Sequence, residues 1–297
     1  MSLGARNSSL HIPVLGIIGV GLIGGSFSLV LKNTKKTTKV LGVGRDPQSL
    51  SKALELGLID EVVELEQMAQ EADVIVIATP VQALAKVLER MLPYLRESTI
   101  LTDVGSTKTE VIQVAREILG KRIQQFVPGH PIAGSHASGP TAARLDLFLN
   151  RNVILTPLPE NNPADVDLIV QAWRECGAHV QLLDRAENHD EIFAAVSHFP
   201  HFLASCYMSF MDSTSTGRQA LTMGGTGFRD FTRIAAGSPE MWRDIFMSNR
   251  AAMLNQLAGF KQELERTTQL LSAGDEQQIY EWLKESAIAR RNWKEND

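Results

Sequence analysis

Short runs of valine and isoleucine alternate with helix-length stretches between Ile12 and about Asp184, and this alternation restricts the possible folds more than any other feature of the chain. Each run has the length of an ordinary strand and is bounded by Gly, Pro, Asp or Thr. The predicted strands are Val14–Ile18, Val40–Val43, Val74–Ala78, Ile100–Thr102, Val153–Leu155 and Val180–Leu183. The predicted helices between them include Leu22–Leu31, Ser49–Leu56, Val81–Leu92 and Lys108–Leu119. Strands that alternate with helices predict a mostly parallel sheet covered on both faces, and the right-handed crossover rule favours a doubly wound α/β fold.

The strand signal disappears after about Ala186, and the rest of the chain has helical periodicity. Two series of apolar residues repeat at seven-residue spacing and interleave into a seam of the coiled-coil type. The series are Phe246, Met253 and Phe260, and Leu257, Leu264 and Leu271. The seam has two interpretations, helix packing inside one subunit and a contact between two subunits. We favour the second, which predicts a homodimer formed through an all-helical C-terminal domain.

A glycine-rich turn follows the first predicted strand and opens the first predicted helix. Its residues are Gly19, Val20, Gly21, Leu22, Ile23 and Gly24, which match G-x-G-x-x-G. The first glycine permits a tight turn, the second lets backbone N–H groups approach a pyrophosphate, and the third lets the helix pack on the strand. The helix N-terminus adds partial positive charge. A turn without a ligand is the alternative, but the strand and helix on either side favour a Rossmann-like dinucleotide-binding domain.

The end of the second predicted strand indicates which dinucleotide is preferred. A site for NAD places an acidic residue there, which binds the ribose 2′-hydroxyl. In this chain Gly44 occupies the acidic position and Arg45 follows it, and a guanidinium can pair with the 2′-phosphate of NADP. The alternative makes Asp46 the ribose acid, shifted by two positions, with Arg45 in solvent. We predict NADP as the preferred cofactor and NAD as the alternative.

These patterns divide the chain into three regions. The first ten residues are rich in Ser and Gly and polar, so we expect a disordered tail over residues 1–11. Residues 12–184 are expected to form the N-terminal dinucleotide-binding domain. Residues 185–297 are expected to form the all-helical domain, which would bind the substrate and dimerise.

Three further segments place reactive side chains at the carboxyl edge of the predicted sheet. Thr79 and Pro80 follow the third predicted strand. Ser106 lies between a strand and a helix, where a serine can cap the helix N-terminus. His130 lies in a loop rich in Gly and Pro, and a histidine can act as a general base near neutral pH. From its segment alone, a structural loop histidine is the default interpretation of His130.

Composition excludes several classes of protein. The chain has 29 basic and 34 acidic residues, a net charge of -5, which argues against a nucleic-acid partner. No apolar stretch is long enough to span a bilayer and the N-terminus has no signal-peptide pattern, so we expect no membrane association. Two cysteines cannot form a disulfide framework, which favours a reducing compartment, the cytoplasm. Cys, His and acidic residues show no metal-site spacing, so we expect no metal.

The segments that carry these side chains form an ordered set with others further along the chain. The set is Gly19–Ser26 (GVGLIGGS), Asp103–Lys108 (DVGSTK), Gly129–Gly134 (GHPIAG), Val196–Phe202 (VSHFPHF), Gly227–Ala235 (GFRDFTRIA) and Met241–Asp244 (MWRD). Together these motifs resemble the prephenate/arogenate (cyclohexadienyl) dehydrogenase family, in the family's order and over nearly the whole chain. The resemblance implies oxidative decarboxylation of prephenate or arogenate with hydride transfer to NAD(P), a step of tyrosine biosynthesis that yields 4-hydroxyphenylpyruvate or tyrosine.

The resemblance also implies roles for individual side chains. His130 matches the family's catalytic histidine, which accepts the proton of the ring hydroxyl, and Ser106 matches the serine that hydrogen-bonds it near the nicotinamide. Arg233 matches the arginine that binds a substrate carboxylate, a role that suits its fixed fork of donors. His201 matches a substrate-contacting histidine, and His198 lies three residues earlier, near the same face of a predicted helix. The alternatives are that the two histidines bind a metal and that the arginine pairs with the acid three residues before it.

One position departs from the family pattern. Two residues after Gly134 the family often carries a glutamate, where this chain has His136, which puts an ionic gate over the substrate in doubt. Two other functions remain open. A hydroxyacid-type dehydrogenase would depend on a lysine in the helical domain, and Lys261, within the seam, is the first lysine after Lys121. A non-catalytic, NADP-sensing regulator would keep the glycine turn without needing the other site residues.

Overall fold

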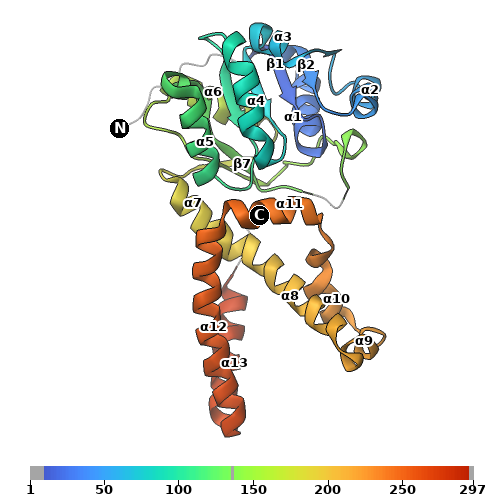
Figure 1. Ribbon diagram of the computed structural model, residues 1–297, viewed down its shortest axis with the longest axis vertical. Coiled ribbons are helices and arrows are strands. Elements are labelled where there is room, and N and C mark those ends of the chain that lie inside the picture. The colour runs from blue at the N-terminus through green and yellow to red at the C-terminus, as the bar shows by residue number, and fades with distance from the viewer. Residues whose placement is uncertain (1–9, 135–136, 294–297) are drawn as a thin grey trace.

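Figure 1 shows the computed structural model of the chain, which describes residues 10–134 and 137–293. The first part is a layered body of strands and helices. The second part consists of helices, which extend from one side of the body as two diverging arms. Most of the predicted N-terminal tail, residues 1–9, lies outside the described residues.

Six parallel strands form the main sheet in the order β3-β2-β1-β4-β5-β6. Their bounds are β1 (Ile12–Ile18), β2 (Thr37–Val43), β3 (Glu61–Val62), β4 (Val74–Ile77), β5 (Ile100–Asp103) and β6 (Phe126–Val127). Ile18 at the end of β1 is level with Val43 of β2 and Ile77 of β4. The strand order changes direction between β1 and β4, and such a sheet binds its ligand outside the carboxyl ends at this point. The predicted doubly wound α/β fold is confirmed.

Helices cover both faces of the main sheet. One face carries α1 (Leu22–Asn33), α2 (Pro47–Glu55) and α6 (Pro163–Glu175), and the other carries α3 (Leu65–Glu71), α4 (Leu84–Met91) and α5 (Thr109–Leu119). Val74 and Val76 of β4 belong to the core on the first face, whereas Ile75 and Ile77 belong to the core on the second. This alternation explains why the strand is a continuous apolar run. Short 3-10 segments are η1 (Val81–Ala83), η2 (Leu92–Tyr94), η3 (Gly120–Gln125) and η4 (Pro140–Ala142).

The last two predicted strands belong to a second, three-stranded sheet, and in this detail the expectation of one mostly parallel sheet is wrong. Its strands are β7 (Gly129–Pro131), β8 (Asn152–Leu155) and β9 (His179–Leu182). Strand β7 is antiparallel to β8, so His130 lies on a strand rather than in a loop. Pro128 separates β6 from β7 and has no N–H group to continue the pairing. Gly129 passes close over the end of β5, where a Cβ would lie 2.9 Å from the carbonyl oxygen of Asp103.

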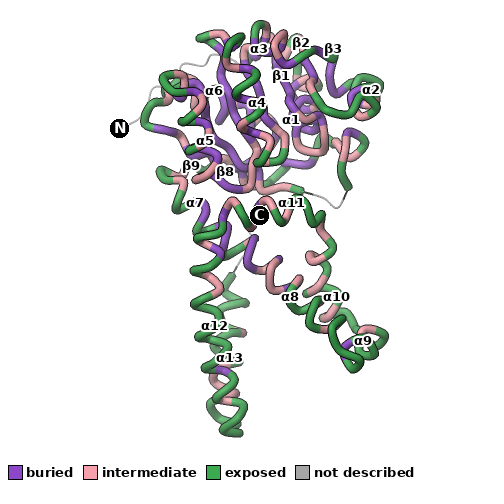
Figure 2. Tube along the Cα trace, in the orientation of Figure 1, coloured by how far each residue is buried: buried purple, intermediate pink, exposed green. Residues whose placement is uncertain are grey.

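The C-terminal part is helical, as predicted. Its elements are α7 (Ala186–Phe193), a π-helical turn (Ala194–His198), α8 (Phe199–Ser213), α9 (Ser215–Leu221), α10 (Thr226–Thr232), η6 (Arg233–Ala236), α11 (Pro239–Ser248), α12 (Arg250–Ala273) and α13 (Glu276–Asn292). Helix α11 lies against the body, α8 to α10 form one arm, and α12 and α13 form the other (Figure 1). Both arms are mostly exposed along their length (Figure 2). Within the described ranges, no helix combines the length and apolar character that crossing a membrane requires.

The apolar seam predicted in this part divides into two halves. Met253, near the start of α12, is buried in a small core with Ala194 and Phe199. Leu264 and Leu271 lie farther along the helix, with 56% and 65% of their surface exposed. Packing inside the subunit therefore accounts for the near half of the seam, and the far half faces solvent.

Candidate active site

The glycine-rich turn passes directly against the end of β4. Gly19 has a φ of +91°, in the left-handed region, and a Cβ there would lie 2.6 Å from the carbonyl oxygen of Ala78. A Cβ at Gly24 would lie 2.6 Å from the carbonyl oxygen of Gly19. By contrast, the Cβ position of Gly21 is open, and α1 begins without a side-chain cap or an acidic residue in its first turn. Open space beside unpaired N–H groups at a helix N-terminus fits the pyrophosphate of a dinucleotide.

Arg45 and Asp46, directly after β2, are the two candidates for binding the ribose or its phosphate. The carboxylate of Asp46 caps α2, because it accepts hydrogen bonds from the N–H groups of Gln48 and Ser49 at 3.2 and 3.0 Å. The hydroxyl and N–H groups of Ser49 lower the pKa of this carboxyl. Arg45 is exposed and makes no hydrogen bond or ion pair with any other residue in the described part of the chain. The carboxylate of Asp46 is thus occupied in capping α2, whereas the guanidinium of Arg45 is available to a ligand.

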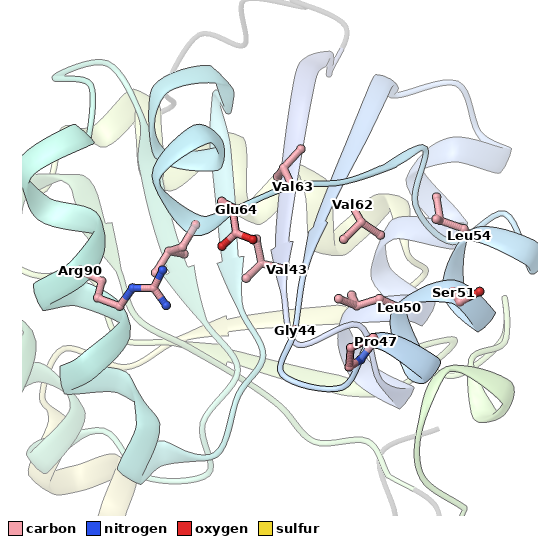
Figure 3. Close-up of a pocket in the computed structure, with 11 residues that line it drawn as sticks. Val43, Gly44, Pro47, Leu50, Ser51, Leu54, Val62, Val63, Glu64 and Arg90 are labelled. Carbon is pink, nitrogen blue, oxygen red and sulfur yellow. The ribbon is translucent and has the colours of Figure 1, made fainter.

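A cavity of about 400 Å³ adjoins this turn, within the range of small-molecule sites. Figure 3 shows its lining, with Leu50 and Leu54 of α2 on one side and Arg90 of α4 with Glu64 on the other. Gly44 lies at its edge, where a Cβ would meet the side chain of Leu50 at 3.2 Å. The cavity lies beside the strand end at which the fold accommodates the adenosine half of a dinucleotide.

Thr79 and Ser106 lie on neighbouring loops at the carboxyl edge of the sheet. The hydroxyl of Thr79 is buried without a hydrogen-bond partner in the described residues, next to Pro80. Ser106 is half-buried in the loop between β5 and α5, and no hydrogen bond joins it to His130 within the described residues. Helix α5 is capped at Lys108 without a side-chain bond from its own segment, so the expectation that Ser106 caps this helix is wrong. The predicted catalytic contact of Ser106 stays a prediction.

A buried ion pair attaches β7 to the end of β5. The ammonium group of Lys108, which has no exposed surface, donates to a carboxylate oxygen of Asp103 and to the carbonyl oxygen of Gly129 at 2.7 Å. The other carboxylate oxygen of Asp103 accepts the N–H of Gly129 at 3.0 Å. Burial lowers the pKa of Lys108, against the opposing effect of Asp103. The motif DVGSTK therefore contains the two side chains that hold the strand of His130 in place, a role that its spacing alone did not indicate.

His130 is 8% exposed and lies where the body meets the helical part. Its Nδ1 lies 2.9 Å from Nε2 of His189 on α7, and its ring contacts that of Phe193 with centroids 4.8 Å apart. Burial lowers the pKa of His130 well below its usual value, and nearby His189 and Lys108 lower it further. The imidazole is therefore neutral near pH 7, the form in which a histidine accepts a proton.

The sequence did not indicate that His189 and Asp190 belong to this site. The ring of His189 lies 2.8 Å from Oδ1 of Asp190, whose two oxygens accept the N–H groups of Lys108 and Thr109 at 2.7 and 2.9 Å. A carboxylate from the helical part thus caps a helix of the body and connects with the histidine on β7. The adjacent His and Asp, directly after the change from strand to helix periodicity, are the signal that could have found them.

The predicted substrate histidines lie next to this network. Asn249 donates from Nδ2 to the carbonyl oxygen of Asp190 at 2.7 Å and to Nδ1 of His198 at 3.1 Å. The other nitrogen of His198, Nε2, is buried and has no hydrogen-bond partner in the described residues. His201 is 4% exposed and stacks on Trp242 of α11, with ring centroids 3.6 Å apart. Asn249 thus connects His198 to Asp190, and the rings of His198 and His201 both lie beside Trp242.

Arg233 comes from a different segment of the helical part. It is exposed at the start of η6, a segment that packs against α8. Asp230, its suggested alternative partner, forms an ion pair with Arg229 at 3.2 Å. His136, at the position of the family's glutamate, lies outside the described residues. Within the ranges that the structure describes, no three His, Cys, Asp or Glu side chains are grouped to hold a metal ion.

Comparisons with known proteins agree with this architecture. The prephenate dehydrogenase nucleotide-binding domain matches residues 27–182, and the prephenate dehydrogenase dimerization domain matches residues 185–285. Prephenate dehydrogenase of Lactococcus lactis is 34% identical over 93% of this chain and 76% of its own, and cyclohexadienyl dehydrogenase of Zymomonas mobilis is 32% identical over 93% and 94%. The crystal structure of prephenate dehydrogenase from A. aeolicus with hydroxyphenyl propionate and NAD+ has a TM-score of 0.89 at 34% identity, covering 96% of this chain and 99% of that one. The chain therefore belongs to the prephenate dehydrogenase family.

Proposed function

We propose that this chain catalyses the oxidative decarboxylation of prephenate or arogenate and that NADP is its preferred cofactor. Family membership supports the reaction, since the relatives named above are prephenate and cyclohexadienyl dehydrogenases. In this reaction hydride leaves the ring carbon that bears the hydroxyl, the bond to the ring carboxylate breaks and releases CO₂, and the ring becomes aromatic. Aromatisation supplies the driving force, so the protein must chiefly orient the substrate and handle one proton.

The observation that carries the proposal is a buried, neutral imidazole with one nitrogen engaged and the other available. Nδ1 of His130 is bonded to His189, which leaves Nε2 to accept the proton of the ring hydroxyl and to return it to the phenol oxygen. Burial excludes competing water from this exchange. Ser106, in the neighbouring loop, is proposed to hold the same hydroxyl or the imidazole in line.

The substrate is proposed to contact the helical part. Nδ1 of His198 accepts a hydrogen bond from Asn249, so its unpartnered Nε2 carries a hydrogen and can donate to a substrate oxygen. His201, stacked on Trp242, is proposed to border the same substrate. Arg233 is proposed to bind a carboxylate of the substrate through its paired N–H donors. Residues 12–184 would thus bind the cofactor, and residues 185–297 would bind the substrate.

The residues of the dinucleotide site fit a nicotinamide dinucleotide, which when bound supplies the hydride acceptor. The turn Gly19–Gly24 would hold the pyrophosphate, and Thr79, Pro80 and Ser106 would border the nicotinamide half. The preference for NADP rests on Arg45, which is available for a 2′-phosphate while Asp46 caps α2. The A. aeolicus structure was obtained with NAD+, so both cofactors belong in the test.

We also propose a homodimer formed through the exposed half of the helical part, working in the cytoplasm. Leu264 and Leu271 of α12 and Leu283 of α13 each have more than half of their surface exposed. A row of exposed leucines on long helices is typical of an interface between subunits. Cys176 and Cys206 are free thiols, in keeping with a reducing compartment.

The test is a steady-state assay of the purified enzyme with prephenate and with arogenate, each with NADP and with NAD. We expect reduced nicotinamide and CO₂ to form in equal amounts with at least one substrate, and a higher kcat/KM with NADP than with NAD. Absence of turnover with both substrates would contradict the proposed reaction. A higher kcat/KM with NAD would contradict only the cofactor preference.

A further inference from the structure

His130, His189 and Asp190 form one hydrogen-bonded line that crosses the boundary between the two parts of the chain. His130 Nδ1 lies 2.9 Å from His189 Nε2, and His189 Nδ1 lies 2.8 Å from Oδ1 of Asp190. The three side chains are 8%, 0% and 4% exposed. Buried polar groups depend on one another for their hydrogen bonds, so the protonation of one determines that of the next.

The carboxylate at one end of the line has a defined state. Asp190 accepts hydrogen bonds from His189 and from the N–H groups of Lys108 and Thr109 at the start of α5. Burial by itself raises the pKa of Asp190, but these hydrogen bonds outweigh it and the pKa lies below its ordinary value. The side chain is therefore ionised at neutral pH and can only accept hydrogen bonds.

The direction of every bond along the line then follows. Because Asp190 only accepts, Nδ1 of His189 must carry a hydrogen. Burial lowers the pKa of His189, so the ring is neutral and its Nε2 has a lone pair. His130 must donate to that lone pair from Nδ1, since two facing acceptors would repel each other. A neutral imidazole with hydrogen on Nδ1 has none on Nε2.

We propose that Asp190 and His189 are positioning residues that hold His130 in the tautomer with an unprotonated Nε2. The inference rests on the proposed function, in which Nε2 is the base. A histidine in the other tautomer would present a hydrogen to the substrate hydroxyl and could not accept its proton. The same line ends in a carboxylate, which stabilises the positive charge that His130 acquires during the reaction.

The line also makes the base depend on the contact between the two parts of the chain. Asp190 and His189 belong to α7, whereas His130 belongs to β7 and the two N–H donors belong to the start of α5. Separation of the helical part from the body would remove the partner of His130 Nδ1. Correct assembly of the two parts is therefore a condition for the correct tautomer.

The decisive measurement is ¹⁵N NMR of the free protein with ¹⁵N-labelled histidine, because one-bond and two-bond couplings distinguish the two tautomers of each ring. The signal of His130 is assigned by its loss in His130→Asn. We expect the wild-type protein to show hydrogen on Nδ1 of His130. In Asp190→Asn we expect the Nε2–H tautomer and a fall in kcat of roughly 100- to 10,000-fold, with a smaller change in KM.

A second pair of variants keeps the test valid if Asp190→Asn, which also loses a helix cap, does not fold. In His189→Gln the amide can donate to Asp190 and accept from His130 in the same order as the imidazole, so we expect the wild-type tautomer and kcat within about tenfold. His189→Leu lacks both groups and should lose the tautomer and about 100-fold or more in kcat. The matched control is Glu187→Gln, an exposed carboxylate on the same helix, whose kcat should equal that of the wild type.

Three results would overturn the proposal. The first is a wild-type His130 with hydrogen on Nε2. The second is an Asp190→Asn or His189→Leu protein that keeps the wild-type tautomer, even if its kcat falls. The third is a changed tautomer without a change in kcat. Failure of the proposed function is distinguishable, since the tautomer is read without substrate or cofactor and turnover of the wild type is measured separately.

Discussion

The body and the helical part differ in how completely they bury their own apolar side chains. The body fills both faces of its main sheet, and Trp173 at the centre of one core has no exposed surface. The helical part has a core of Ala194, Phe199 and Met253, while Leu271 on its far arm is 65% exposed. A layer with two filled faces is stable by itself, whereas long helices with exposed leucines gain stability from a partner. The comparison indicates that the body covers its own apolar side chains, whereas the far arm of the helical part leaves apolar surface uncovered.

The site lies where these two regions meet, and each contributes a different kind of group. The body supplies the proposed base, His130, on a strand held by the buried pair of Lys108 and Asp103. The helical part supplies His189 and Asp190, which are proposed to orient it. A rigid layer can hold a reacting group within a narrow range of positions, and a separate helical part can present a substrate to it.

The largest expected effect is a loss of turnover in His130→Asn without a loss of cofactor binding. His130→Asn removes the proposed base from the body, so kcat should fall about 100- to 10,000-fold while the KM for the dinucleotide stays unchanged. Steady-state kinetics with saturating substrate measure both. His179→Asn, on an exposed strand of the same sheet, is the control and should keep full turnover. Full turnover in His130→Asn would remove the base from the proposed mechanism.

The next effect tests whether the body is the better-packed region. Trp173 packs against Phe27 and Phe148, with ring centroids 4.6 and 5.1 Å apart. Trp173→Ala should lower the free energy of unfolding by about 3–5 kcal/mol, because it leaves a large cavity. Urea denaturation followed by circular dichroism measures the change. A loss below about 1 kcal/mol would show that this core is not closely packed.

A third effect concerns pH and belongs to the boundary between the regions. Burial lowers the pKa of His198 from 6.5 to about 4, so the fold favours its neutral form. The stability that neutral His198 contributes is fully present above about pH 6.5. It is lost as the pH falls toward 4, which lowers the free energy of unfolding by roughly 3 kcal/mol in total. Unfolding measured across this range should show falling stability with falling pH. His198→Gln should reduce that slope, and an unchanged slope would contradict the assignment.

A fourth, smaller effect tests the exposed arm. Leu271→Asp places a charge on the far half of α12, and we expect it to weaken the proposed dimer by roughly 2 kcal/mol, about 30-fold in Kd. Analytical ultracentrifugation over a range of concentrations measures the dissociation. Leu145→Asp changes an exposed leucine of the body and should leave the dimer intact. An equal increase in Kd from the two substitutions would contradict an interface on the helical part.

The smallest expected effect tests whether Arg45 gives the body its proposed preference for NADP. Arg45→Ala should raise the KM for NADP about tenfold, through loss of a charge-assisted hydrogen bond, and leave the KM for NAD nearly unchanged. Lys52→Ala, which changes a half-buried cation on α2 that pairs with Glu55, is the control and should change neither value. An unchanged KM for NADP in Arg45→Ala would contradict the predicted preference.

Local patterns were enough to predict much of this protein. Runs such as Val74–Ile77 and the turn Gly19–Gly24 act through their immediate neighbours, because strand pleat and a positive φ are properties of a few adjacent residues. They predicted the α/β fold, the helical C-terminal part and the dinucleotide turn. The family motifs also predict a catalytic role for His130, which stays a prediction. The separate sheet was not predicted, since Pro128 and Gly129 redirect the chain only in the context of β5.

The partners of His130 could be identified only from the tertiary structure. His189 and His130 are 59 positions apart, and Asp190 lies 82 positions from the N–H group of Lys108 that it accepts. No periodicity or spacing connects such residues, because their contact arises when a helical segment packs against the edge of a sheet. Local sequence patterns were enough to predict most of the strands and helices, and the roles given to the motif residues stay predictions. The packing of the two parts places His189 against Nδ1 of His130 and thereby supports the proposed tautomer, since a tautomer depends on the group that occupies the other nitrogen.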